Sequence, residues 1–109
     1  PSSVDSNTLV EQLIEGETQF VYPVTIDEKA TYEIYTDMHS DYLEIEDTVL
    51  YILNENYETI TSNDDFGGSG TFSYVAQIFE PGNYIVVVEE FNGDPFNAAL
   101  IINRLDVTY

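Results

Sequence analysis

Acidic and amide side chains gather just before a glycine-rich turn in the stretch TSNDDFGGSG, residues 61–70. Asn63, Asp64 and Asp65 offer side-chain oxygens, and the glycines that follow allow the backbone to turn sharply and present its carbonyls. Oxygen ligands of this kind suit Ca²⁺, which takes about 6–8 of them in a tolerant geometry. Because Asn and Asp also favour polar turns, an ordinary solvated loop is the alternative. The ligand spacing of an EF-hand is absent.

The predicted strands that flank this loop determine what else lies near it. The runs 47–53 (DTVLYIL) and 58–62 (ETITS) are rich in β-branched and aromatic residues and are separated by a short polar turn. We expect them to form an antiparallel hairpin in which Leu53 lies opposite about Glu58. Counting outward, Asp47 then lies opposite about Asp64, at the open end of the hairpin.

A second hairpin is predicted from the runs 71–79 and 83–91, which flank Pro81-Gly82, a pair that suits a type II turn. Phe72 then lies opposite about Phe91, in a register that can slip because type II turns are not the favoured hairpin connections. The loops that leave the two hairpins would share one rim of the domain. The residues expected at this rim are Glu46, Asp47, Asn63, Asp64, Asp65, Asn92 and Asp94.

Carboxylates that share one rim repel one another, so a bound cation would stabilise them. Calcium is the cation that suits these residues, and the rim residues are its candidate ligands, with an ordinary acidic loop as the open alternative. Zinc or copper would require histidine or cysteine. The chain has no cysteine and a single histidine, His39, which lies in a polar stretch and is expected at the surface.

Short β-rich runs also make up most of the remaining chain, at residues 19–26, 31–36 and 98–107. Strands of this length, separated by turn residues, predict one all-β domain over residues 1–109, an antiparallel sandwich or barrel. The runs VLYIL and YIVVV are apolar on both alternations, so we expect them at the centres of their sheets.

The amino-terminal segment is the exception to this pattern. Residues 1–11 are predicted to be a linker or a short helix, because Thr8 and Glu11 have the spacing of a capping box. The longer stretch 6–16, which ends at Gly16, fits a short helix or an edge strand equally well. From the opening PSSVDSNT we expect a module of a larger, secreted parent.

Negative charge dominates the composition, with 21 Asp and Glu against two basic residues and a formal net charge of -19. Because Lys and Arg supply most affinity for phosphate, nucleic acid and anionic lipid are excluded as partners. No stretch approaches the roughly 20 apolar residues of a membrane helix. The self-repulsion of such a chain would be offset by calcium, by high external salt or by a basic partner.

The stretch DTVLYILNENYETITSNDDFGGSGTFSYVAQIFEPGNYIVVVEEFNG resembles the bacterial pre-peptidase C-terminal domain. The similar elements are Asp-Thr-x-Leu-Tyr at 47–51, Asn-Asp-Asp at 63–65 and Pro-Gly-x-Tyr at 81–84, and the likeness spans about residues 12–104. It implies a jelly-roll-like β-sandwich that serves secreted bacterial and archaeal peptidases as an accessory module. Relatives of the collagen-binding modules bind calcium and a protein polymer. Asp47, Asp64 and Asp65 match acidic positions of the family, so the resemblance implies that these three are the principal calcium ligands.

Two features qualify what the resemblance implies. The family often has an acidic pair before its first aromatic strand, whereas this chain has only Glu17 there. A calcium site built from the amino-terminal linker is therefore not expected. Asp37, Asp41 and Glu44 could form another acidic cluster.

The resulting interpretation is a non-catalytic, extracellular, calcium-binding accessory domain attached to a catalytic domain of the same parent. It would aid stability, secretion or binding to a protein or polysaccharide polymer. The alternative is an acidic structural or adhesive domain of a surface protein adapted to high salt. Paired carboxylates can hydrolyse glycosides, but no nucleophile elbow, phosphate loop or histidine-based zinc motif is present, so we do not expect an enzyme.

Aromatic side chains on a sheet face could grip a polymer, and the chain has nine Tyr and six Phe. Most are expected to pack in the core or across strands. Tyr32, Tyr35 and Tyr74 are candidates for exposure. The polymer-binding residues of the family cannot be matched to this sequence.

Overall fold

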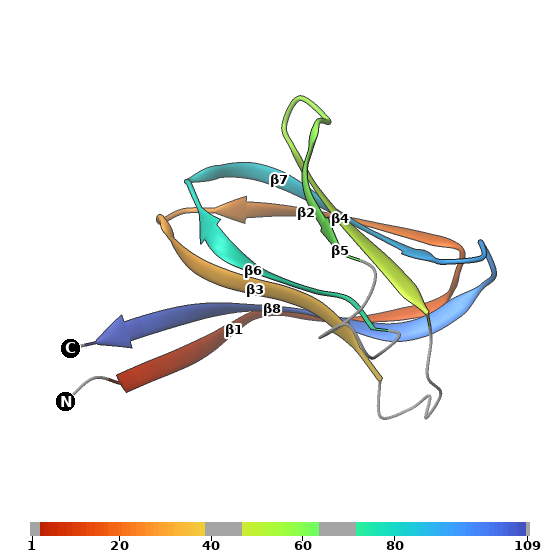
Figure 1. The fold of residues 1–109 in the computed structure, drawn as a ribbon, viewed down its shortest axis with the longest axis horizontal. Coiled ribbons are helices and arrows are strands. Elements are labelled where there is room, and N and C mark those ends of the chain that lie inside the picture. Colours follow the sequence, from red (N-terminus) through yellow and green to blue (C-terminus); the bar gives the residue numbers. More distant parts are fainter. Residues whose placement is uncertain (1–2, 39–46, 64–71, 109) are drawn as a thin grey trace.

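The computed structural model describes residues 3–38, 47–63 and 72–108, which form eight β-strands (Figure 1). The strands are β1 (Ser3–Glu17), β2 (Gln19–Ile26), β3 (Ala30–Asp37), β4 (Thr48–Asn54), β5 (Thr59–Asn63), β6 (Tyr74–Phe79), β7 (Gly82–Glu90) and β8 (Phe96–Thr108). The described residues include no helix that could cross a membrane. The predicted strand runs are all found, with ends that differ by up to three residues.

The strands form two four-stranded antiparallel sheets. Sheet A has the order β1-β8-β3-β6 and sheet B the order β2-β7-β4-β5. The predicted antiparallel sandwich is therefore confirmed. VLYIL lies in β4 and YIVVV in β7, and these are the two inner strands of sheet B, as their apolar pattern predicted.

One predicted hairpin is correct and the other is wrong. β4 and β5 pair, with Leu53 opposite Thr59 and Leu50 opposite Asn63. β6 and β7 do not pair, because β6 joins β3 in sheet A while β7 lies between β2 and β4 in sheet B. Pro81-Gly82 thus carries the chain from one sheet to the other. Gly82 has a φ of 156° and begins β7, so the predicted type II turn is not formed here.

The amino-terminal segment forms the edge strand β1 and not a helix. It pairs with β8 from Ser3 opposite Thr108 to Glu17 opposite Phe96, with two irregularities in the register. The two ends of the chain therefore lie side by side (Figure 1). Pairing along the whole of β8 gives alternate backbone groups of β1 a hydrogen-bond partner, and this outweighs the weak helix signals at its start.

The core lies between the sheets and is built from alternate residues of the inner strands. Leu50, Ile52, Val86 and Val88 of sheet B are completely buried, and in sheet A the strand β8 contributes Leu100 in the same way. Burying a side chain of this size stabilises the fold by about 1.5–3 kcal/mol. The two sheets therefore share one apolar core.

Aromatic residues close one end of the sandwich, where β2 and β6 end and β3 and β7 begin. Phe79 packs edge-on against Tyr32 and Tyr84, with ring centroids 6.2 and 5.3 Å away. The Tyr32 hydroxyl donates to the Glu28 carbonyl and the Tyr84 hydroxyl donates to the Glu80 carbonyl. We call this end the aromatic pole and the opposite end the acidic pole.

Both basic residues of the chain lie at the aromatic pole. Lys29 Nζ is 3.2 Å from Glu80 Oε1, and Arg104 Nη1 is 3.5 Å from Glu28 Oε2. The Lys29–Glu80 pair is largely exposed, so it adds little to stability. The pair matters here because it places the positive charge of Lys29 far from the acids of the other pole.

Candidate functional site

The acidic pole is where β4 and β5 meet the end of β7. Thr48, the first residue of β4, pairs with Glu90, the last residue of β7. The chain continues this contact beyond the strands, because the Phe91 amide donates to the Asp47 carbonyl over 2.8 Å. Asp47 therefore lies beside the turn that contains Asn92 and Asp94, as the sequence predicted.

β5 runs back to the same pole and ends at Asn63, which lies opposite Leu50. The observed register differs from the predicted one by one residue at Leu53 and, across a bulge between Ile52 and Leu53, by two residues at Leu50. Glu46, Asp64 and Asp65 lie outside the described residues. The expected pairing of Asp47 with Asp64 therefore stays a prediction.

A carboxylate that sequence reasoning missed shapes the turn after β7. Glu90 Oε1 accepts hydrogen bonds from the Asn92 amide at 2.6 Å and the Asp94 amide at 3.0 Å. The Gly93 amide donates to the Glu90 carbonyl, and Gly93 has a φ of 79°, which glycine adopts without strain. Glu90 thereby fixes a turn from which Asn92 and Asp94 are exposed to solvent.

Three buried hydroxyl groups join the sheets beneath this pole. Thr36 of β3, Thr48 of β4 and Ser73, just before β6, are each at most 1% exposed. Thr48 Oγ1 lies 2.8 Å from Thr36 Oγ1 and 2.9 Å from Ser73 Oγ. Sequence alternation contained a signal for this cluster, since Thr36 shares an inward face with Ile34, and Thr48 with Leu50.

Proton counting orients this hydroxyl cluster. The Ser73 hydroxyl donates to the Thr48 carbonyl at 2.8 Å, which uses its single proton. Thr48 must then donate to Ser73 Oγ, and Thr36 to Thr48 Oγ1. The Ser73 amide completes the chain by donating to Thr36 Oγ1 at 2.9 Å. Every hydroxyl therefore donates once and accepts at least once, so this polar group is buried without an unmet hydrogen bond.

The donor chemistry of the acidic pole fits a hard cation, but the described residues do not complete a site. They contain no group of three or more His, Cys, Asp or Glu side chains placed to hold a metal ion. Asp47 and Asp94 provide carboxylates and Asn92 an amide oxygen, which suit calcium and not zinc. A calcium site here would also require Glu46, Asp64 or Asp65.

The second predicted acidic cluster has one described member. Asp37 ends β3 and is exposed, and its Oδ1 accepts a hydrogen bond from the Met38 amide at 2.7 Å. Asp41 and Glu44 lie outside the described residues, as does His39. Glu17 ends β1 and is exposed at the same pole.

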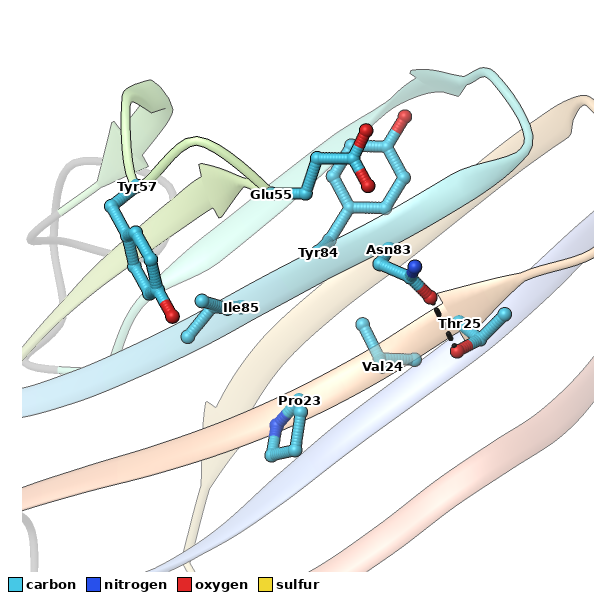
Figure 2. A pocket seen from close by; sticks show the side chains of 8 residues that line it. All are labelled: Pro23, Val24, Thr25, Glu55, Tyr57, Asn83, Tyr84 and Ile85. Atoms are coloured by element: carbon cyan, nitrogen blue, oxygen red, sulfur yellow. Dashed lines mark hydrogen bonds between the residues drawn. The ribbon is translucent and has the colours of Figure 1, made fainter.

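A shallow groove lies on the outer face of sheet B, near the tip of the β4–β5 hairpin, and has a volume of about 410 Å³. In Figure 2, the Tyr57 ring descends from this tip towards Ile85, and a hydrogen bond from Thr25 to Asn83 crosses the opposite wall. Tyr57 is 74% exposed and has a φ of 63°, which is uncommon for a bulky residue. The lining residues are Pro23, Val24, Thr25, Glu55, Tyr57, Asn83, Tyr84 and Ile85.

The three tyrosines proposed for exposure differ in position. Tyr32 is 2% exposed and belongs to the core, so that prediction was wrong. Tyr35 and Tyr74 lie opposite each other on β3 and β6 and are partly exposed. Tyr35 alternates with the buried Ile34, which places it on the outer face of sheet A.

Comparison with known proteins supports this fold. The chain is similar to the pre-peptidase C-terminal domain of a collagenase from Bacillus anthracis, with a TM-score of 0.56, 14% identity and coverage of 97% of this chain and 88% of that chain. It is also similar to PliG of Aeromonas hydrophila, a periplasmic inhibitor of g-type lysozyme, with a TM-score of 0.51, 12% identity and coverage of 94% and 86%. No protein-family model and no curated protein sequence matches the chain. The fold that the sequence resemblance implied is therefore confirmed.

Proposed function

We propose that this chain is a non-catalytic, calcium-binding accessory domain of a secreted bacterial or archaeal enzyme of the peptidase type. The fold it shares with the collagenase domain supports the accessory role. The extracellular location and the attachment to a catalytic domain of the same parent rest on that likeness. The domain would serve stability, secretion or contact with an extracellular protein or polysaccharide.

The observation that carries the calcium proposal is the separation of charge along the sandwich. Asp47 and the turn with Asp94 lie together at the acidic pole, whereas Lys29 and Arg104 lie at the aromatic pole. Among the described residues, the ion pairs of Lys29 with Glu80 and of Arg104 with Glu28 place both basic side chains away from these acids. An external cation with a preference for oxygen ligands would offset the charge of the acids.

Calcium at this pole would join segments that are distant in sequence. Asp47 precedes β4, Asp64 and Asp65 follow β5, and Asn92 and Asp94 follow β7. An ion bound by all three segments would hold three chain connections together and would bind the folded state only. At a free calcium concentration 100-fold above the dissociation constant, it would stabilise the domain by about 2.7 kcal/mol.

The test is a calorimetric calcium titration of the domain together with its melting temperature in calcium and in chelator. We expect binding, a higher melting temperature in calcium, and loss of both effects in Asp64→Asn and Asp94→Asn variants. Asp27→Asn is the matched control, because Asp27 is an exposed acid of the β2–β3 turn at the aromatic pole. An unchanged melting temperature in chelator would remove calcium from the proposal.

The net charge of -19 favours a second candidate, an acidic structural or adhesive domain of a surface protein adapted to high salt. Its stability would rise with molar KCl and would not respond to micromolar calcium. Thermal melts in the two salts therefore distinguish the candidates, since screening depends on ionic strength and a specific site does not.

A further inference from the structure

The outer face of sheet A presents a compact group of polar and aromatic side chains. Glu33 and Tyr35 are alternate residues of β3 and point away from the core, because Ile34 between them is buried. Glu33 lies directly opposite Asn103 of β8, and Tyr35 lies directly opposite Tyr74 of β6. These four residues, which we call the sheet A cluster, come from three adjacent strands.

Hydrogen bonds hold the carboxylate of the cluster in a fixed position. The Tyr74 hydroxyl donates to Glu33 Oε2 at 2.8 Å, and Asn103 Nδ2 donates to Glu33 Oε1 at 2.7 Å. The rings of Tyr35 and Tyr74 lie 5.8 Å apart and are inclined by 37°. Each carboxylate oxygen has one donor, so the group is oriented before any partner arrives.

The Asn103 amide leaves one acceptor unused. The residue is 8% exposed, and its Oδ1 is buried without a hydrogen-bond partner among the described residues. The amide cannot be reversed, because a carboxylate only accepts and Nδ2 must therefore face Glu33. A buried acceptor without a donor is costly, so the bond from Nδ2 to Glu33 is what holds the amide in this orientation.

The electrostatic surroundings of the cluster favour a cation. Burial raises the pKa of the Tyr35 hydroxyl above 10.0, a hydrogen bond with Asn103 lowers it, and the charges of Glu33, Asp37 and Glu11 raise it again. The three carboxylates thus act on one ring. The described residues contain no group of three acidic or histidine side chains that could hold a metal ion, so a metal is not the best occupant.

We propose that the sheet A cluster binds an arginine side chain of a basic partner polypeptide. A guanidinium group carries five N–H donors and no acceptor, which complements the oriented Glu33 carboxylate. Its flat face can stack on a tyrosine ring, as cations do. The net charge of -19 would attract a basic segment and speed its encounter with this face.

The test uses a short peptide with two arginines separated by glycine, titrated into the isotopically labelled domain at about 150 mM salt. We expect the backbone amide signals of Glu33, Tyr74 and Asn103 to shift with a single saturating curve. The same peptide with citrulline in place of arginine keeps the shape and loses the charge, and it should not bind. Binding of both peptides alike, or no shift with the arginine peptide, would overturn the proposal.

Variants separate a specific site from general attraction to an acidic protein. Glu33→Gln removes one charge at constant size and should weaken binding by about tenfold. Glu89→Gln is the matched control, because Glu89 lies on the outer face of sheet B and accepts a hydrogen bond from Gln19. Equal losses in the two variants would overturn the proposal in favour of non-specific attraction. The signal map on the unmodified domain remains decisive if Glu33→Gln does not fold.

Discussion

The two poles of the sandwich are closed by different physical means. At the aromatic pole, the ring of Phe79 packs between the rings of Tyr32 and Tyr84. The hydroxyl groups of the two tyrosines bond only to backbone carbonyls of the nearby turns. At the acidic pole, the hydroxyl cluster of Thr36, Thr48 and Ser73 joins the sheets through directed hydrogen bonds. Ring packing tolerates small shifts, whereas a chain of hydrogen bonds fixes positions closely. The acids proposed to bind calcium lie above the more precisely positioned end.

The largest effect is expected from removing the central ring of the aromatic pole. Phe79→Ala should lower the free energy of unfolding by about 3–5 kcal/mol, because it deletes a fully enclosed ring and leaves a cavity. Ile78→Ala in the same strand is the control, since Ile78 is 61% exposed and should cost about 0.5 kcal/mol or less. Urea denaturation measures both. Similar losses would mean that the rings do not close this pole.

A smaller effect is expected from deleting one hydroxyl at each pole. Thr48→Val keeps the shape but leaves Thr36 without an acceptor and Ser73 Oγ without a donor, so it should cost about 1–3 kcal/mol. Tyr84→Phe also removes one hydroxyl, but its bond to the Glu80 carbonyl is exposed and should be replaced by water at a cost of about 0.5 kcal/mol. Equal costs, measured in the same denaturant series, would contradict the contrast between the poles.

A further effect is expected at alkaline pH, at Tyr74 of the sheet A cluster. Burial, followed by the hydrogen bond to Glu33, raises the pKa of Tyr74 from 10.0 to about 12. The neutral hydroxyl is retained in the folded state while the unfolded chain ionises, so this stabilisation is complete below pH 10 and is lost as pH rises through 12. Between pH 9 and pH 12, the free energy of unfolding should fall more in the unmodified domain than in the Tyr74→Phe variant. The difference should be on the order of 1 kcal/mol, because solvent partly screens this group. Parallel falls in the two proteins would show that Tyr74 is not perturbed.

The sequence was most informative where a property is local. The alternation and turn residues predicted the strands β2 to β8 but not β1, and the apolar runs in β4 and β7 identified the inner strands of sheet B. The short NENY turn also predicted the β4–β5 pairing, although a bulge changed its register. The sequence did not predict which strands pair when the pairing depends on the sheet to which each strand belongs. Alternation shows that a residue points inward but not which of the two sheets contains it. The wrong pairing of β6 with β7 has this cause.

In the candidate sites, too, the sequence predicted local features but not the contacts that depend on the three-dimensional arrangement. The convergence of Asp47 with the turn of Asn92 and Asp94 was predicted correctly, although one of the two hairpins used to derive it does not exist. In the predicted arrangement β7 paired with β6, and in the structure it pairs with β4. Both pairings direct the end of β7 to this pole. The roles of Glu90 and Asn103 depend on which backbone amides and side chains face them, and residue types alone do not specify this.

The pairing of Ser3 with Thr108 has a consequence for how the domain can be mounted. A polypeptide joined to either end would leave from the same end of the sandwich, so the domain would be attached to its neighbour at that end alone. Thr108 is at the far end of β8 from Phe96, which lies at the acidic pole. The acidic pole would then face away from the neighbouring polypeptide, separated from it by the length of β8, about 40 Å for thirteen extended residues.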